Sequence, residues 1–391
     1  MNNFQIYRPT EFLFGKDTEL QTAELLKKHG ATKVLVHYGG GSVIKSGLLG
    51  RVEQNLKNAG ITYELLGGVV PNPHDTLVYE GVELCKRLGL DFILAIGGGS
   101  VIDSAKAISL GALYDGDFWD FWTRKAEPKK ALKIGTILTI PAAGSEASNS
   151  AVITKVTDLD IPSKRGLNTD LYVPTFSILN PELHYTLPPF QTACGIADML
   201  AHVMERYFTN TPDVEVTDRL GEALMLTIIN MAPIVMADPQ NYAARANLAW
   251  AGALAHNGTC GVGRVEDWAT HRIEHELSAV YDVAHGAGLA VLFPVWMKYV
   301  HETNLDRFAQ FAKRVFGIDK GDKKASALEG IEALAEFFKS IGLPTNFAEL
   351  GAKSEDIDVM IDLLREKFGD TMGAFRTLTM DDVRKIYEMA V

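Results

Sequence analysis

Short apolar runs alternate with helical patterns over residues 1–187. The runs are rich in β-branched side chains and fall at Lys33–His37, Phe92–Ile96, Ile134–Ile140 and Thr175–Leu179. Patterns of helical period separate them, at Thr18–Lys28, Leu48–Ala59, Leu77–Leu88 and Val101–Leu110. Short strands separated by helices are typical of a parallel sheet with crossover helices. We therefore predict an α/β fold for this half.

Strand patterns stop at Leu187, which two prolines follow. Prolines end a strand and can open a helix. The rest of the chain predicts consecutive helices, at Phe190–Phe208, Val214–Met231, Ala243–Ala255, Asp267–Val280, His285–Val300, Leu305–Val315, Ala325–Ile341 and Ser354–Lys367. A chain of 391 residues exceeds what one hydrophobic core usually supports. We predict two domains, an α/β domain over 1–187 and an all-helical domain over 188–391, with a ligand site in the cleft between them.

Composition narrows the class of protein. The net charge of −11 repels nucleic acid and anionic membranes, so we expect neither as a partner. The chain has no run of 18 apolar residues and no basic start followed by an apolar stretch, so we expect no membrane span and no signal peptide. The three cysteines are an odd number and lie far apart. They predict no disulfide framework, buried thiols and a cytoplasmic location.

Two glycine-rich turns share one pattern. Residues 39–46 read GGGSVIKS and residues 97–104 read GGGSVIDS, and each follows a predicted strand and opens a helix. Glycines there allow close approach of a ligand, and free N–H groups at a helix start favour phosphate. One such cluster can simply form a tight turn without binding a ligand, but two in the same strand–turn–helix context predict a nucleotide site. The candidate residues are Gly39, Gly40, Gly41, Ser42, Gly97, Gly98, Gly99 and Ser100.

The two turns differ in charge, because Lys45 stands in the first where Asp103 stands in the second. An acidic residue near the adenosine ribose repels a 2′-phosphate, whereas basic groups accept it. If the first turn meets the adenosine end, it favours NADP over NAD. The alternative is that Lys45 is an ordinary solvated lysine at a helix start.

Histidines and one aspartate recur at helical spacing in the second half. Asp198 and His202 are four residues apart, as are His271 and His275, and His285 follows. Residues four apart share a helix face, and three imidazoles with a carboxylate suit Zn²⁺ or Fe²⁺. The spacing leaves open which of the five is not a ligand, and it also permits separate helix-capping residues. Glu205, Glu274 and Glu276 are expected on other faces, at the surface.

These segments together resemble the iron-containing (group III) alcohol dehydrogenases, in particular the NADP-linked butanol dehydrogenase and aldehyde reductase branch. The resemblance runs through YGGGSVIKSG, AIGGGSVIDSAKAI, TIPAAGSEAS, CGIADMLAHVMERY and HRIEHELSAVYDVAHGAGLAVLFP. It implies a fold like dehydroquinate synthase, with a dinucleotide-binding α/β domain and a helical metal domain. It also implies the ligands Asp198, His202, His271 and His285, and places His275 beside substrate and nicotinamide.

The same resemblance assigns the cofactor contacts. Gly97–Ser100 would hold the pyrophosphate, with Asp103 near the nicotinamide end. Family members that prefer NAD carry an aspartate where Gly39 stands, so the first turn resembles the NADP-preferring branch, with Gly40, Ser42 and Lys45 toward the 2′-phosphate. Further contacts implied by matching are Asn72, Thr139, Ser145, Lys164 and Leu179. One departure is Ala143, where the family's usual threonine contacts the cofactor.

The predicted function is a metal-dependent, NADP(H)-linked alcohol dehydrogenase or aldehyde reductase acting on short-chain substrates, with NAD(H) as the other possible cofactor and a homodimer as the expected assembly. Within the same fold, the alternative is an NAD-linked polyol dehydrogenase. Outside it, the alternatives are a metal hydrolase and a non-catalytic metal-binding protein. The paired glycine turns argue against the hydrolase, and the intact set of candidate ligands argues against the non-catalytic protein.

Overall fold

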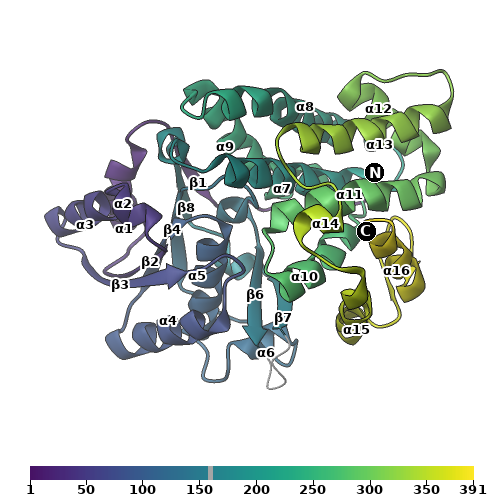
Figure 1. The fold of residues 1–391 in the computed structure, drawn as a ribbon. Helices are drawn as coiled ribbons and strands as arrows, with labels where there is room; N and C mark the ends of the chain where they lie inside the picture. The colour runs from purple at the N-terminus through teal and green to yellow at the C-terminus, as the bar shows by residue number, and fades with distance from the viewer. Residues whose placement is uncertain (157–161) are drawn as a thin grey trace. The chain divides into compact units, whose positions relative to one another are not determined.

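A computed structural model of the chain describes residues 1–156 and 162–391. It divides into two compact units, Tyr7–Thr186 and a second made of Leu187–Val391 with Met1–Ile6. The predicted order of an α/β unit followed by a helical unit is confirmed (Figure 1). The first six residues belong to the helical unit, whereas the sequence prediction grouped them with the α/β part. The backbone N–H of Asn2 donates to the Gly263 carbonyl at 2.8 Å, and this bond ties them to the helical unit.

The α/β unit is built on a parallel six-stranded sheet in the order β1-β8-β5-β4-β2-β3. The four predicted strands are present, and their bounds are β2 Lys33–Gly39, β4 Phe92–Gly97, β5 Lys133–Leu138 and β8 Phe176–Leu179. The two edge strands, β1 Glu11–Phe14 and β3 Thr62–Val69, were not predicted. Their burial is incomplete, so they lack the continuous apolar run that identifies a central strand. A separate antiparallel pair, β6 Ser150–Val156 and β7 Pro162–Asn168, was also not predicted.

Helices connect and cover these strands. Alternate residues such as Val34, Val36 and Leu94 form one core with side chains of α1 and α3. Helix α5 packs on β4 and is buried over most of its length. The helices of this unit are α1 Thr22–Lys28, α2 Ser42–Lys45, α3 Leu48–Asn58, α4 Asp75–Leu88, α5 Gly99–Gly111 and α6 Trp119–Trp122. Because each crossover returns the chain to a parallel strand, the carboxyl ends of all six strands lie at one edge of the sheet.

The second unit packs its helices around α11, whose residues from Gly286 to Met297 are all buried. Helix α11 contacts α7, α10, α13 and α16. The helices are α7 Pro189–Tyr207, α8 Glu215–Ala237, α9 Tyr242–His256, α10 Ala269–Tyr281, α11 His285–Val300, α12 Leu305–Phe316, α13 Lys323–Ser340, α14 Phe347–Leu350, α15 Ile357–Phe368 and α16 Met380–Glu388. The unit is not wholly helical, since β9 Thr371–Met372 pairs with β10 Leu378–Thr379. The sequence predicted neither these strands nor α14 and α16.

Helix α8 is the one described helix whose length and mean hydropathy would suffice to cross a membrane. Those two properties are weak evidence, because a core helix of a water-soluble protein shares them. Within its unit α8 packs against α7, α9 and α12. The three cysteines, Cys85, Cys194 and Cys260, are buried free thiols, as their spacing predicted.

Candidate metal centre and nucleotide-binding turns

Helix α7 presents Asp198 and His202 on one face, as their spacing of four residues predicts. Both side chains are buried. Nδ1 of His202 lies 2.9 Å from the backbone oxygen of Asp198. A carbonyl oxygen can only accept a hydrogen bond, so Nδ1 carries the proton and Nε2 is the nitrogen left with a lone pair. The helix thereby offers one carboxylate and one imidazole nitrogen as metal donors.

Two further histidines reach Asp198 from other helices. His271 lies in the first turn of α10, and His285 is the first residue of α11. Donor atoms of Asp198, His202 and His271 lie within 4.8 Å of one another, and Nε2 of His285 lies 3.8 Å from Oδ1 of Asp198. The structure thus places the four residues that the family resemblance proposed as ligands in one cluster.

The chemistry of this cluster fits a divalent cation. Nε2 of His271 is buried and makes no hydrogen bond within the described residues. The buried Oδ1 of Asp198 lies 3.0 Å from Nδ1 of His202, which is also 2.9 Å from the Asp198 carbonyl oxygen. Buried atoms with few or no partners are costly unless another group completes their bonding. Burial alone would raise the pKa of Asp198, but His202, His285 and His271 outweigh it and lower the pKa to about 2. Burial holds the pKa of His271 well below its usual value. An ionised carboxylate and neutral imidazole are the forms in which these groups bind zinc or iron.

The expectation that Glu205, Glu274 and Glu276 lie at the surface is wrong, because all three are buried. Oε1 of Glu205 accepts hydrogen bonds from both the backbone N–H and Nδ1 of His271, each at 2.8 Å. Glu274 bonds Nδ1 of His285. Such carboxylates orient a metal-binding histidine and leave its Nε2 for the metal.

A signal for two of these carboxylates was present in the sequence. Glu205 follows His202 by three residues, and Glu274 follows His271 by three. Residues three apart are neighbours on a helix surface, so both carboxylates share the buried side of their helices. Glu276 has a different role, since its carboxylate forms a buried ion pair with Lys367 at 2.7 Å. That partner lies too far along the chain for local spacing to reveal it.

His275 lies beside the cluster and is half-buried. Its ring centroid is 5.5 Å from that of His285. A second possible triad combines it with Glu274 and His285. We favour the cluster around Asp198 as the metal centre, because Glu274 is engaged by Nδ1 of His285 and the buried Nε2 of His271, which makes no hydrogen bond in the described part of the chain, belongs to the cluster around Asp198.

In the α/β unit, both glycine turns begin at the carboxyl ends of neighbouring parallel strands. Gly39 ends β2 and Gly97 ends β4. At the same edge Thr139 follows β5, and Leu179 ends β8. This edge is where open α/β sheets bind their ligands, so the structure brings these four predicted cofactor residues to one place.

The turn after β4 is tightly packed and opens a long helix. Gly98 caps α5, whose first turn contains Gly99 and Ser100. A Cβ on Gly97 would lie 2.4 Å from Cγ2 of Val101, so only glycine fits there. As at any helix start, the first backbone N–H groups of α5 have no partner within the helix, and an anion can accept hydrogen bonds from them. The turn after β2 is more open, since Gly40, Gly41, Ser42 and Lys45 are exposed.

The remaining predicted cofactor residues form two bonded pairs. Nζ of Lys164 donates to Oδ1 of Asn72 at 3.0 Å. The hydroxyl of Ser145 donates to Oδ1 of Asp103 at 2.6 Å, and the N–H of Val152 donates to the other carboxylate oxygen at 2.8 Å. Asp103 thus fixes the loop that carries Ser145.

A buried lysine that the sequence analysis did not identify supports the same loop. Nζ of Lys106 lies within 3.2 Å of five oxygen atoms, which belong to Ser145, Ser148 and Ser150. Burial lowers its pKa to about 8, although the nearby Asp103 and Glu146 oppose this. Lys106 is the central cation that holds the segment 145–150 in shape.

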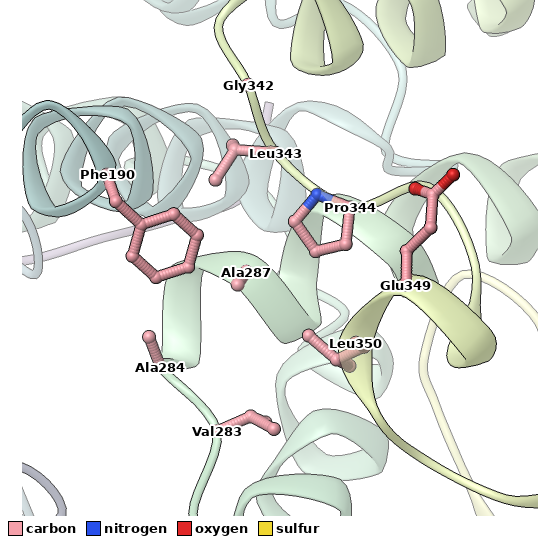
Figure 2. Close-up of a pocket in the computed structure, with 9 residues that line it drawn as sticks. All are labelled: Phe190, Val283, Ala284, Ala287, Gly342, Leu343, Pro344, Glu349 and Leu350. Carbon is pink, nitrogen blue, oxygen red and sulfur yellow. The ribbon is translucent and has the colours of Figure 1, made fainter.

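An apolar pocket of about 560 Å³ lies in the helical unit, around the first turn of α11. Figure 2 shows Phe190, Leu343 and Leu350 gathered around this turn, with the Glu349 carboxylate at one side. Ala284 and Ala287 of the lining stand on either side of His285 in the chain, but no proposed metal ligand lines the pocket.

Comparisons with known proteins agree with this architecture. The family model described as iron-containing alcohol dehydrogenase matches residues 9–181, and that of the Fe-containing alcohol dehydrogenase family, C-terminal, matches 192–391. The chain is 42% identical over 393 residues to the probable NADH-dependent butanol dehydrogenase 1 of Bacillus subtilis, and 37% identical over 394 residues to the NADPH-dependent aldehyde reductase YqhD of Escherichia coli. Both alignments cover 100% of each chain.

A solved structure shows the same fold. The crystal structure of NADH-dependent butanol dehydrogenase A from Thermotoga maritima superposes with a TM-score of 0.96 at 41% identity, over 100% of this chain and 99% of that one. The family predicted from the sequence is therefore confirmed. The chain belongs to the iron-containing alcohol dehydrogenase family, whose members are oxidoreductases.

Proposed function

We propose that this protein is a metal-dependent, NADP(H)-linked alcohol dehydrogenase that interconverts short-chain aldehydes and primary alcohols. The observation that carries the proposal is the cluster of buried Asp198, His202 and His271 with the half-buried His285. Within it, Nε2 of His271 lacks a hydrogen-bond partner among the described residues, and Oδ1 of Asp198 lies 3.0 Å from Nδ1 of His202 and 3.8 Å from Nε2 of His285. A metal at these four groups would satisfy both atoms. The glycine turns at the carboxyl edge of the sheet support the nucleotide part of the proposal.

The protein groups around the metal have separable tasks. Glu205 and Glu274 accept the Nδ1–H of His271 and His285, which fixes the ring orientations and directs each Nε2 away from its glutamate. Asp198 contributes the one negative charge among the proposed ligands. When bound, the divalent metal supplies a Lewis acid for the substrate oxygen, and the nicotinamide supplies or accepts a hydride.

Reduction of an aldehyde needs one hydride at the carbonyl carbon and one proton at the oxygen, and it yields the primary alcohol and the oxidised nucleotide. We propose His275 as the group that relays this proton, through water or the nicotinamide ribose, because it lies beside His285 and is half-buried. His275→Ala should slow turnover and leave one metal per chain. Loss of the metal in this variant would show that His275 is a ligand instead.

The preference for NADP rests on the first glycine turn, which offers Gly39 and Lys45 and contains no acidic group. The names of the relatives differ in the nucleotide they give. The Bacillus and Thermotoga enzymes are called NADH-dependent, and YqhD is called NADPH-dependent. NAD(H) is therefore the second candidate cofactor. An aspartate fits at position 39, because the nearest atoms to a Cβ there are 3.5 and 3.6 Å away.

The deciding experiment compares kcat/KM for NADPH and NADH with butyraldehyde, in the wild type and in Gly39→Asp. We expect the wild type to favour NADPH and the variant to lose that preference, because a carboxylate repels the 2′-phosphate. A clear preference for NADH in the wild type would contradict the assignment. No oxidation of either nucleotide with any aldehyde would contradict the function itself. A matched assay with chelator separates a metal-dependent dehydrogenase from a protein that merely stores metal.

Three further properties are part of the proposal. The metal is iron or zinc, since both accept three imidazoles and a carboxylate, and elemental analysis of the active protein identifies it. The buried free thiols support a cytoplasmic location. We expect a homodimer, which light scattering during size-exclusion chromatography would test.

A further inference from the structure

The backbone of Trp268 is strained where the metal-binding helix α10 begins. Its φ is +67°, and its side chain forms no capping hydrogen bond to the helix. Six non-glycine residues in the described part of the chain have positive φ, and the other five are Asp, Asn or Arg. Asp and Asn tolerate this region far better than a bulky aromatic residue. Such strain persists only where the surrounding structure enforces it, and it often marks a functional position.

Two charged side chains hold the indole of Trp268 in one orientation. Its Nε1–H donates to Oε2 of Glu266 at 2.6 Å, and the guanidinium of Arg206 lies over the ring at 4.6 Å from the centroid. Nε of Arg206 is 3.2 Å from Oε1 of Glu266, so the two charged side chains also contact each other. We call Arg206 and Glu266 together the clamp. Arg206 is itself buried and donates to the His202 carbonyl at 2.7 Å. The clamp therefore connects the indole to the helix that carries Asp198 and His202.

The indole is in ring contact with the metal-binding histidines. Its centroid lies 5.1 Å from that of His271 and 5.8 Å from that of His202. His256, also half-buried, is 5.7 Å away. The two proposed ligands are buried, whereas Trp268 keeps part of its surface exposed. The indole is therefore held beside the buried ligand rings, and part of it remains accessible.

We infer that Trp268 is a specificity-determining residue, whose fixed indole limits the space beside the metal available to the carbon chain of the substrate. This inference rests on the proposed function. A wall of this kind admits unbranched aldehydes and excludes those branched next to the carbonyl carbon. The clamp of Arg206 and Glu266 gives the wall its selectivity, because a mobile ring would move aside for a branched chain.

The test compares the metal-loaded wild type with Trp268→Gly and Trp268→Phe. Glycine removes the wall and readily adopts a φ of +67°, so this change relieves strain. Phenylalanine keeps an aromatic wall and loses the hydrogen bond to Glu266. The readouts are the metal content, the melting temperature, and kcat/KM for butyraldehyde, isobutyraldehyde and pivaldehyde with the preferred nucleotide.

We expect Trp268→Gly to raise the isobutyraldehyde-to-butyraldehyde ratio of kcat/KM by about tenfold or more, the scale at which a pocket discriminates one methyl group. The ratio for Trp268→Phe should stay closer to wild type, and all three proteins should hold one metal per chain. An unchanged ratio in metal-replete Trp268→Gly would overturn the inference while leaving the proposed function intact. So would loss of metal in both variants, which would make the indole a support for the histidines. A wild type inactive with every aldehyde would overturn the proposed function, and this inference with it.

Discussion

Replacing Gly286 with alanine should disturb the metal centre through packing alone. Gly286 follows His285 at the start of α11, where this helix crosses α7. A Cβ added to Gly286 would lie 2.0 Å from the carbonyl oxygen of Cys194 and 2.8 Å from its Cα. Ordinary contact begins at 3.4 Å, so the helices must move apart by more than 1 Å. Both obstructing atoms are backbone, and no side-chain rotation removes the clash.

The displacement acts directly on the proposed ligands. Cys194 is one helical turn before Asp198, and Nε2 of His285 now lies 3.8 Å from Oδ1 of Asp198. Metal–ligand distances tolerate only about 0.2 Å. We expect Gly286→Ala to weaken metal binding by at least about tenfold, as lesser disturbances around metal sites do. Overpacking should also lower the free energy of unfolding by about 1–3 kcal/mol, which lowers the melting temperature by about 2–12 °C for a unit of this size.

Gly252→Ala in α9 is the matched control. A Cβ there would meet only the flexible end of the Met199 side chain, at 3.4 Å. Alanine favours helix over glycine by about 1 kcal/mol, so the control should be neutral or slightly stabilised. Melting curves with and without chelator, and zinc titration against a competing chelator, give the two quantities. If Gly286→Ala matches Gly252→Ala in both, the reasoning from helix packing to metal geometry is refuted.

Three further predictions concern buried polar groups. Burial lowers the pKa of His37 to about 4, whereas a histidine in an unfolded chain has a pKa of about 6.5. Between these two pH values the unfolded state binds more protons than the folded state. The free energy of unfolding therefore falls as the pH drops through this window. Between pH 7 and 5, the free energy of unfolding of His37→Gln should fall by about 2 kcal/mol less than that of the wild type, as measured by denaturant titration. Equal decreases in the two proteins would contradict this. Lys106→Met leaves five oxygens without their donor and should cost about 3–5 kcal/mol while weakening NADPH binding, measured by nucleotide fluorescence. An unchanged melting temperature would show that the buried ammonium is dispensable. Glu205→Gln should lower zinc affinity by about 10–100-fold in a chelator competition, and wild-type affinity would show that the carboxylate is not needed to orient His271.

Local patterns in the sequence predicted much of this protein. Central strands such as β4 are buried along their whole length, and the resulting apolar runs are legible without a structure. The edge strands β1 and β3 were missed because their partly exposed residues carry no such run. The pairs formed by Asp198 with His202 and by His271 with His275 were visible because helical spacing is a local property. The choice of four proposed ligands among the five candidates came from the family resemblance and not from spacing.

What the sequence by itself determined was therefore the division into an α/β part and a helical part, the family, and the side chains with metal-binding chemistry. Only the tertiary structure decided how those side chains are supported. Glu205 and Glu274 were expected at the surface, yet they are buried against His271 and His285. The indole of Trp268 packs under the guanidinium of Arg206, which is remote in sequence. The physical reason is the same in each case: periodicity reports which face of a helix a residue occupies, whereas burial of a charged or strained group is stabilised by a partner that only folding brings near.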